Sequence, residues 1–403
     1  MSSPSSEAKA AGGALAHSKK ALLVLGIIFI AVNLRAPLTS VGPLIGSIRE
    51  SLGISNTMAG TITTFPLLAF ALLSPLTPML ARRFGTERVI MVSLWALAGG
   101  IVLRSLAGTG ALFGGTILLG LAIAVCNVLM PSLVKREFPG SVGLMTGVYS
   151  VSMNMCGAIA SGISVPIAVD LGLGWRGALG CWAVLALVSI LVWLPQFRAG
   201  QRLAGSAPAR RGSNGSLWRS ALAWQVTIFM GLQSLIFYIV ITWFPQILVD
   251  RGMSSDTAGW MLSLMQFALL PVTFIIPILA GRMNNQRVLV IITVVLYLTG
   301  IGGFYFGGSA LIPLWAIILG IAIGCSFSLA MMFFSLRTRD AHDAAKLSGM
   351  AQSLGYLLAA AGPTLFGMLH DRTGGWDMPF LLLAAASLLV LGCGLGAARD
   401  RTL

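Results

Sequence analysis

The sequence predicts an all-α integral membrane protein in which twelve transmembrane helices form two pseudo-symmetric six-helix bundles. Of the 403 residues, 57% are hydrophobic and only 9% are charged, which is too apolar for a soluble domain of ordinary composition. Apolar runs of about 20 residues, the length that spans a bilayer, recur along the whole chain. Short patterns in the first half also recur in the second half. These three observations together define the predicted fold class.

The predicted spans follow one another with short polar connections. They cover residues 20–47, 57–81, 87–107, 111–134, 141–168, 176–197, 219–249, 254–281, 286–306, 310–336, 345–369 and 376–397. Residues 1–18, rich in Ser, Ala and Gly, are predicted to form a disordered tail. The first span follows two lysines, as in a secretory signal, but it is too long for one, so we expect it to be retained.

The distribution of basic residues predicts the orientation. Placing both termini in the cytoplasm assigns 20 of the 26 Lys and Arg residues to the cytoplasmic side, 5 to the outer side and Arg35 to a span. The positive-inside rule strongly favours this orientation in a bacterial-type inner membrane. Because topology accounts for the net charge of +14, and because the basic residues form short clusters between spans, no nucleic-acid partner is expected.

An internal repeat divides the chain into two halves. "GISNTMAG" at 53–60 matches "GMSSDTAG" at 252–259, "TGVYS" at 146–150 parallels "SGMAQ" at 348–352, and the "GW" at 174 recurs at 375. We therefore predict one bundle over 19–197, a cytoplasmic linker over 198–218, a second bundle over 219–398 and a cytoplasmic tail over 399–403. In transporters built from such repeats, the substrate site lies near the midplane between the halves.

Three stretches carry a family resemblance: "NVLMPSLVKREFP" at 127–139, "PLLAFALLSPL" at 66–76 and "LSGMAQSLGYLLAAAGP" at 347–363. They resemble the cyanate permease and 2-nitroimidazole transporter branch of the major facilitator superfamily. The resemblance implies two six-helix bundles that alternate access for a small anion or a compact polar aromatic compound. "LARRFGTER" at 80–88 also resembles the loop motif that follows the second helix in this superfamily, but Arg82 replaces its acidic residue and Pro78 replaces its glycine.

Arg35 is the charged residue that the span map places deep in the membrane. An arginine at a helix centre costs about 2.5 to 3.5 kcal/mol on insertion scales, so it normally faces a protein interior or a wet cavity. Its partner is either a carbonyl or polar side chain of the protein, in which case it pins the first helix, or an anion or electron-rich group of a substrate that the planar guanidinium holds. No Asp, Glu or His is predicted at this depth, which disfavours organic cations and leaves no visible proton relay.

Other polar and aromatic residues are predicted at similar depth. With Arg35 they form the candidate substrate-binding set: Arg35, Asn33, Asn127, Asn154, Tyr149, Gln233, Gln266, Gln352 and Tyr356. Ser150 and Asn154 share one helical face, and at the repeat offset they map onto Gln352 and Tyr356. We expect these two polar stripes to face one cavity, although each side chain alone could equally be a contact between helices.

No enzyme is expected, because paired carboxylates, a His cluster or a nucleophile with its base are not seen at depth. The five Cys residues lie in apolar runs without a CxxC pair or a nearby His, so no metal and no cofactor are expected. The predicted partners are a small-molecule substrate and the lipid bilayer, and we expect a monomer. The alternative function is a multidrug efflux carrier for lipophilic compounds.

Overall fold

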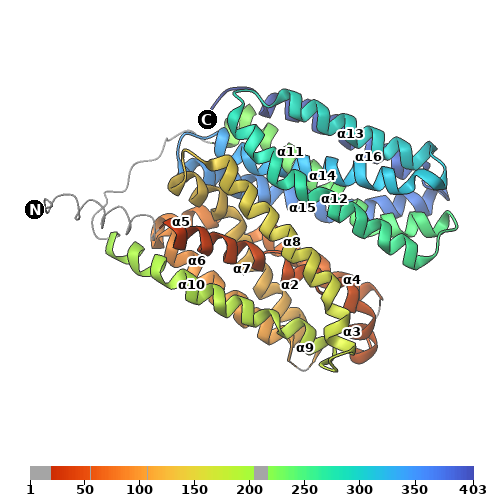
Figure 1. Ribbon diagram of the computed structural model, residues 1–403, viewed down its shortest axis with the longest axis horizontal. Helices are drawn as coiled ribbons and strands as arrows, with labels where there is room; N and C mark the ends of the chain where they lie inside the picture. Colours follow the sequence, from red (N-terminus) through yellow and green to blue (C-terminus); the bar gives the residue numbers. More distant parts are fainter. Residues whose placement is uncertain (1–19, 55, 107, 204–216) are drawn as a thin grey trace, which may run out of the picture.

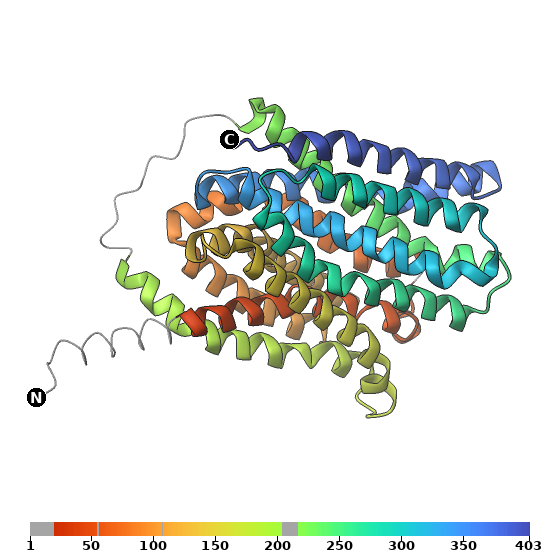
Figure 2. The same ribbon diagram turned by 45° about the horizontal axis from the view of Figure 1, so that its top comes forward.

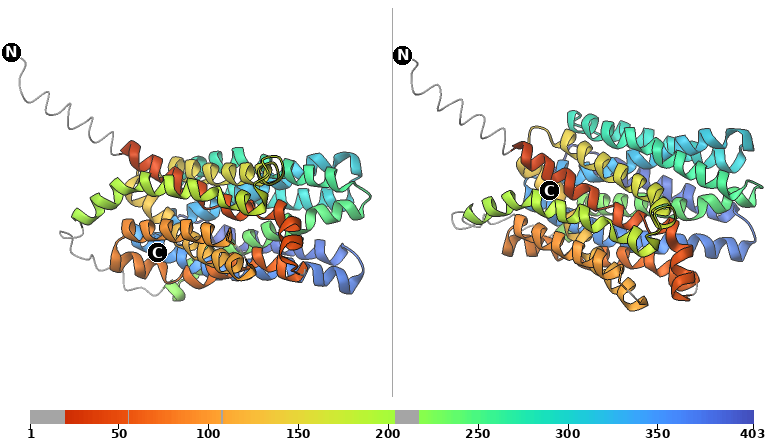
Figure 3. Two further views of the ribbon diagram at one scale, coloured as in Figure 1. Left: turned by 90° about the horizontal axis from the view of Figure 1, so that it is seen from below. Right: turned by 60° about the horizontal axis from the view of Figure 1, so that its bottom comes forward.

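A computed structural model describes residues 20–54, 56–106, 108–203 and 217–403 of the chain, and in these ranges all regular structure is helical (Figure 1). The predicted tail 1–18 and residues 204–216 of the predicted linker lie outside the described residues. Long helices run roughly parallel to one another through both halves of the molecule (Figure 3). This arrangement is the predicted fold class.

Helices of the first half come first along the chain. They are residues 20–33, α2 (Ala36–Thr39), α3 (Ile45–Leu52), α4 (Asn56–Leu73), α5 (Thr77–Phe84), α6 (Thr86–Arg104), α7 (Thr109–Glu137), α8 (Val142–Val169), α9 (Gly174–Gly180) and α10 (Trp182–Leu203). The second half contains α11 (Ala221–Asp250), α12 (Ser255–Arg282), α13 (Arg287–Phe306), α14 (Ile312–Leu336), α15 (Ala341–Thr373) and α16 (Asp377–Ala397). Figure 2 shows α11 to α16 gathered on one side of the molecule.

Among the described residues, ten segments are long and apolar enough to cross a membrane, and the bent pair of α4 and α5 brings the number to eleven if it forms one span. The remaining long helix, α15, has the length of a span but carries more polar and small residues. Large apolar side chains cover the outer surface of both halves; Phe306 is 85% exposed, Leu72 72% and Trp260 71%. Such an apolar surface is favourable in contact with lipid and unfavourable in contact with water, so the protein is a multi-pass membrane protein.

The first span is not one continuous helix. Its helix ends at Asn33, residues 34 and 35 form a turn, and α2 begins at Ala36. Pro37 occupies the first turn of α2, where it lacks an N–H to continue the preceding helix. The chain therefore changes direction at Arg35, and the arginine lies at the break instead of on a regular helical face.

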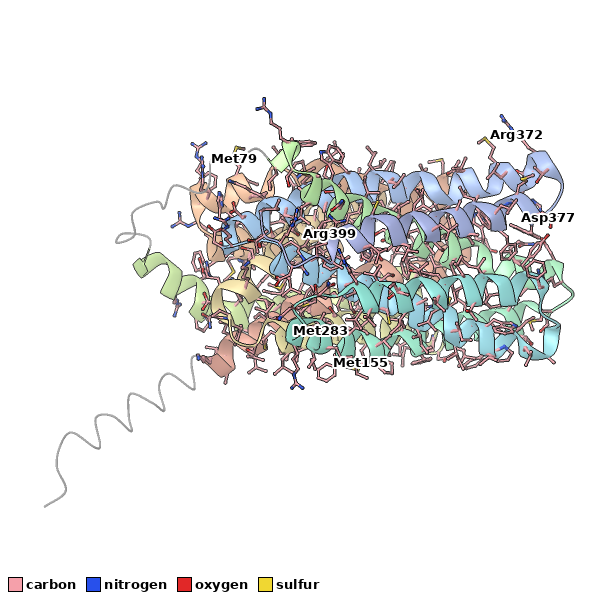
Figure 4. All side chains as sticks on the ribbon, turned by 90° about the horizontal axis from the view of Figure 1, so that it is seen from above. Met79, Met155, Met283, Arg372, Asp377 and Arg399 are labelled. Atoms are coloured by element: carbon pink, nitrogen blue, oxygen red, sulfur yellow. The ribbon has the colours of Figure 1, made fainter. Side chains whose placement is uncertain are left out.

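The two halves are joined most closely at the end of the molecule that carries residue 20 and Leu403, which we call the termini end. Figure 4 places Met79 at this end and Arg372 and Asp377 at the opposite end. Here α8 packs on α12, and α15 packs on α4 and α7. Lys135 of α7 donates to the Thr338 hydroxyl (2.9 Å) and to the Ser335 carbonyl (2.7 Å), beyond the C-terminus of α14 and in its last turn. A cation at a helix C-terminus is favourable, so Lys135 holds this end closed.

Two glycines related by the repeat allow the close approach of the halves. A Cβ at Gly147 of α8 would lie 2.8 Å from the Phe274 carbonyl oxygen, and a Cβ at Gly349 of α15 would lie 2.7 Å from that of Ser74. Real Cβ atoms do not approach a backbone oxygen this closely. Both contacts join opposite halves, so the backbone is tightly packed at two pseudo-symmetric positions.

Candidate functional site

A cavity lies between the halves, with an empty volume of about 400 Å³ including open solvent. Its lining comes from the break in the first span, from α8 and from α11, α12, α14 and α15. The lining residues are Arg35, Asn154, Gln233, Ser234, Phe237, Tyr238, Leu269, Thr273, Ile323, Gly324, Phe327 and Tyr356. A mostly apolar wall with a few convergent polar groups is typical of a small-molecule site.

Arg35 enters this cavity from the first half and meets aromatic side chains of the second half. Its guanidinium carbon lies 5.1 Å from the ring centroid of Phe237, within the range of a cation–π interaction. The guanidinium also lies beside the Tyr238 hydroxyl, to which it can donate. None of the ion pairs in the described part of the chain involves Arg35. The arginine therefore has aromatic neighbours and no acidic partner there.

Some polar groups of the cavity lining already form hydrogen bonds within the protein. Asn154 donates its side-chain amide to the Ser150 carbonyl (2.9 Å), which leaves its own carbonyl oxygen for a ligand. Gln233 donates to the Ser234 hydroxyl (2.7 Å) and is almost fully buried. Tyr356 packs its ring against Phe70 of the opposite half, with centroids 5.0 Å apart. The cavity therefore contains hydrogen-bonding groups from both halves, together with aromatic rings of the second half.

Of the nine predicted site residues, Arg35, Asn154, Gln233 and Tyr356 line the cavity. Asn127, Tyr149 and Gln352 form a separate network: Tyr149 donates to the Asn127 side chain (3.3 Å), and Gln352 donates to the Asn127 backbone carbonyl (3.1 Å). Gln352 and Tyr149 are almost fully buried, so this network joins the halves beside the cavity.

Asn33 and Gln266 also lie away from the cavity. Asn33 is fully buried and donates to the Ser189 hydroxyl of α10 (2.6 Å) and to the Phe29 carbonyl (2.7 Å), so it holds two helices of the first half together. Gln266 is half-buried on α12 and is not among the lining residues. One helical turn separates it from the lining residue Leu269.

Arg104 is more buried in the protein than the span map suggests. Arg104, assigned from the sequence to the outer side, is fully buried at the end of α6. It donates to the Pro37 carbonyl (2.6 Å) and to the Leu179 carbonyl (3.5 Å). Hydropathy places a charged residue at the end of an apolar run at the membrane surface. Here the carbonyls of Pro37 in α2 and Leu179 in α9 draw the side chain inward.

Phe237, Tyr238, Ser234 and Phe327 are lining residues that the predicted set omits. Phe237 and Tyr238 each follow a polar residue of α11 by four positions, Gln233 and Ser234 respectively. Side chains four apart share a helical face, so the helical period starting from Gln233 identifies Phe237. No comparable sequence signal marks Phe327, because α14 is largely apolar and the serines on either side, Ser326 and Ser328, are fully buried and are not among the lining residues.

The chemistry of the cavity follows from its charges. Among the residues that the structure describes, its lining contains no carboxylate and no imidazole, and Arg35 is the one ionised group there. A positive centre with aromatic walls attracts anions and electron-rich rings and disfavours cations. In the described part of the chain, no group of three or more His, Cys, Asp or Glu residues is placed to hold a metal ion.

Comparison with known proteins identifies the chain's relatives. The family model of the Major Facilitator Superfamily matches residues 22–363. The chain is 50% identical to the "Uncharacterized transporter YycB" of Bacillus subtilis, over 96% of each chain. It is 41% identical to the "2-nitroimidazole transporter" of Escherichia coli, over 96% of this chain and 98% of that one. Among solved structures, the proton:xylose symporter XylE aligns with a TM-score of 0.77 and 12% identity, over 95% of this chain and 97% of that one, which indicates a shared fold.

Proposed function

This chain belongs to the major facilitator superfamily, and we propose that it is an alternating-access carrier for a small anion or a compact polar aromatic compound, such as cyanate or a nitroimidazole. In this proposal the two six-helix halves rock around the central cavity, which opens to one side of the membrane at a time. Membership of the family makes the protein a transporter. Its substrate class is inferred from the cavity.

A single observation carries the substrate class: Arg35 lies in the cavity without an acidic partner in the described residues. Arg35 is half-buried and so partly removed from water, and a ligand that brings a negative charge or an electron-rich oxygen would compensate its charge. Guanidinium donates in a planar fork that matches a carboxylate or nitro group. The 2-nitroimidazole transporter at 41% identity supports a flat, electron-rich substrate.

The orientation proposed from the basic residues places the termini end in the cytoplasm of a bacterial-type inner membrane. Because the halves pack together at that end, we propose that the structure is a state closed toward the cytoplasm. A monomer contains both halves and hence a complete cavity. We therefore propose that one chain is the working unit.

The alternative function is multidrug efflux of lipophilic compounds, favoured by the apolar walls of Phe237, Leu269, Ile323 and Phe327. A carrier of that kind depends on apolar area and little on Arg35. The two functions therefore predict opposite results when the arginine is removed.

The experiment uses purified protein in liposomes and a panel of cyanate, benzoate, 2-nitroimidazole and a lipophilic cationic dye. We expect saturable transport of one or more of the first three, a large loss in Arg35→Ala and a partial loss in Arg35→Lys, which keeps the charge without the planar fork. Saturable dye transport that survives Arg35→Ala would instead establish the efflux function and remove the anchor role of Arg35.

A further inference from the structure

The helix α2 ends at Thr39, so the Pro37 carbonyl lacks its usual helical partner, and the Ser40 hydroxyl donates to it at 3.3 Å. In a continuous helix this carbonyl would accept from the N–H of Val41, but Val41 donates to Leu38 instead (3.4 Å). The Arg104 guanidinium donates to this carbonyl at 2.6 Å. A charge-assisted hydrogen bond is roughly twice as strong as a neutral one, so Arg104 fixes the backbone two residues beyond Arg35.

Arg104 is fully buried and none of the ion pairs among the described residues includes it. Burying an arginine with carbonyl acceptors alone is costly, and an apolar residue would avoid that cost. An apolar residue at this position would leave the Pro37 carbonyl with the Ser40 hydroxyl alone, whereas Arg104 adds a shorter, charged donor from another helix. Its second acceptor, the Leu179 carbonyl, lies at the end of α9, so the arginine also ties the break to the body of the first half.

Gly157 of α8 holds the side-chain stem of Arg35 from the other side. A Cβ at Gly157 would lie 2.8 Å from Cγ and 3.1 Å from Cβ of Arg35. The Gly157 carbonyl also accepts from the Thr39 hydroxyl (2.8 Å), which joins α2 to α8. The absent side chain therefore creates the space in which the stem of Arg35 lies.

We propose that Arg104 and Gly157 are positioning residues that together set the location of the Arg35 guanidinium: Arg104 fixes the backbone at the break, and Gly157 fixes the path of the side chain. This inference rests on the proposed function, in which Arg35 contacts the substrate. Neither residue lines the cavity, so both act through Arg35. A misplacement of about 1 Å at a binding group can cost up to about 100-fold in rate.

The first experiment measures transport by Gly157→Ala, with Gly162→Ala as the matched control. Gly162 lies on the same helix, and nothing is within 4 Å of its Cβ position. With benzoate and 2-nitroimidazole as probes, we expect KM to rise about tenfold in Gly157→Ala while the maximal rate per folded protein changes little. Gly162→Ala should keep the wild-type KM. An unchanged KM in folded Gly157→Ala would overturn the role of Gly157.

Arg104→Met and Arg104→Lys test the second positioning residue. Methionine removes the donor to Pro37, whereas lysine keeps a charge and a donor, so we expect a raised KM in Arg104→Met and partial rescue in Arg104→Lys. If Arg104 only stabilises the bundle, Arg104→Met will lower the Tm and the amount of folded protein without altering KM. That result would overturn its positioning role.

A thermal double-mutant cycle needs no substrate. Gly157→Ala should lower the Tm of the Arg35 protein more than that of the Arg35→Ala protein, because the Cγ atom that its methyl group meets is then absent. Equal shifts in both backgrounds would overturn the proposed contact. If Arg35→Ala itself leaves KM unchanged, the proposed function fails; if Arg35→Ala raises KM and the Gly157 and Arg104 variants do not, only the positioning role fails.

Discussion

The guanidinium carbon of Arg35 lies 5.1 Å from the ring centroid of Phe237, so a half-buried cation of the first half contacts an aromatic ring of the second. This contact crosses the cavity between the halves. The ring partly offsets the cost of removing the Arg35 charge from water, and it leaves the N–H donors of the guanidinium available for a ligand. Because the contact joins the two halves, we expect a substrate bound at Arg35 to affect their relative position.

Replacing Phe237 by Leu should weaken substrate binding. The cation–π interaction is worth about 0.5 to 2 kcal/mol, so we expect KM for the transported anion to rise about fivefold. Phe306→Leu is the matched control, because this ring is 85% exposed on the outer surface of the protein. Liposome transport kinetics measure both variants. Equal kinetics in Phe237→Leu and wild type would show that the ring contributes nothing to the site.

Transport should respond to voltage more than to a pH gradient. No carboxylate or imidazole of the described residues lines the cavity, so we expect a carried anion to move its charge without a compensating proton. Each 100 mV is worth about 2.3 kcal/mol for a monovalent ion, or a roughly 50-fold ratio at equilibrium. A potassium diffusion potential, negative inside, should therefore drive the anion out of liposomes. The same rate with and without the potential, together with acceleration by a pH gradient, would indicate proton coupling instead.

Alanine at Gly147 or Gly349 should open the termini end. Each added methyl group would lie under 3.0 Å from a backbone oxygen of the opposite half, and backbone yields little. We expect both variants to shift the population away from the state described here, with longer distances between spin labels across the termini end. Gly99→Ala is the control, because nothing lies within 4 Å of its Cβ position. Unchanged distances in both variants would mean that these contacts do not limit closure.

His342 should make the stability of this state depend on pH. It lies in the first turn of α15, before the predicted span 345–369. Burial is the main cause that lowers its pKa, and the charges of Lys346 and Arg82 lower it further. The charges of Asp340 and Asp343 oppose this shift. The folded protein binds this proton more weakly than the unfolded chain does. The contribution of His342 to the free energy of unfolding is therefore complete above pH 6.5. It falls as the pH decreases from 6.5 through the lower pKa of the folded protein.

The measurement is the Tm of purified protein between pH 5 and 7.5. We expect His342→Gln to lose less Tm on acidification than wild type does. His370→Gln, at the opposite end of the molecule, is the control, and its Tm should fall on acidification as much as that of wild type. An identical pH profile in wild type and His342→Gln would assign the acid sensitivity to other groups.

The twelve-span fold could be predicted because hydropathy and the internal repeat act over whole helices. The burial and the contacts of single residues could not be predicted in this way. Arg104 ends an apolar run, and its burial is explained by the carbonyls of Pro37 in α2 and Leu179 in α9, which its guanidinium reaches. Asn33 and Asn154 are the same residue type at similar predicted depth, yet Asn33 joins two helices while Asn154 lines the cavity. Which face of a helix meets the cavity depends on its neighbours, and its own sequence does not specify them.

The most direct test of the central claim is a crystal structure of the protein with 4-bromobenzoate, whose bromine is located by anomalous scattering and whose carboxylate marks the site of the anion. We expect the carboxylate on the guanidinium of Arg35 and the ring between Phe237 and Tyr356. A carboxylate bound elsewhere, with Arg35 paired to an acidic residue of its own chain, would contradict the proposal that this arginine receives the substrate.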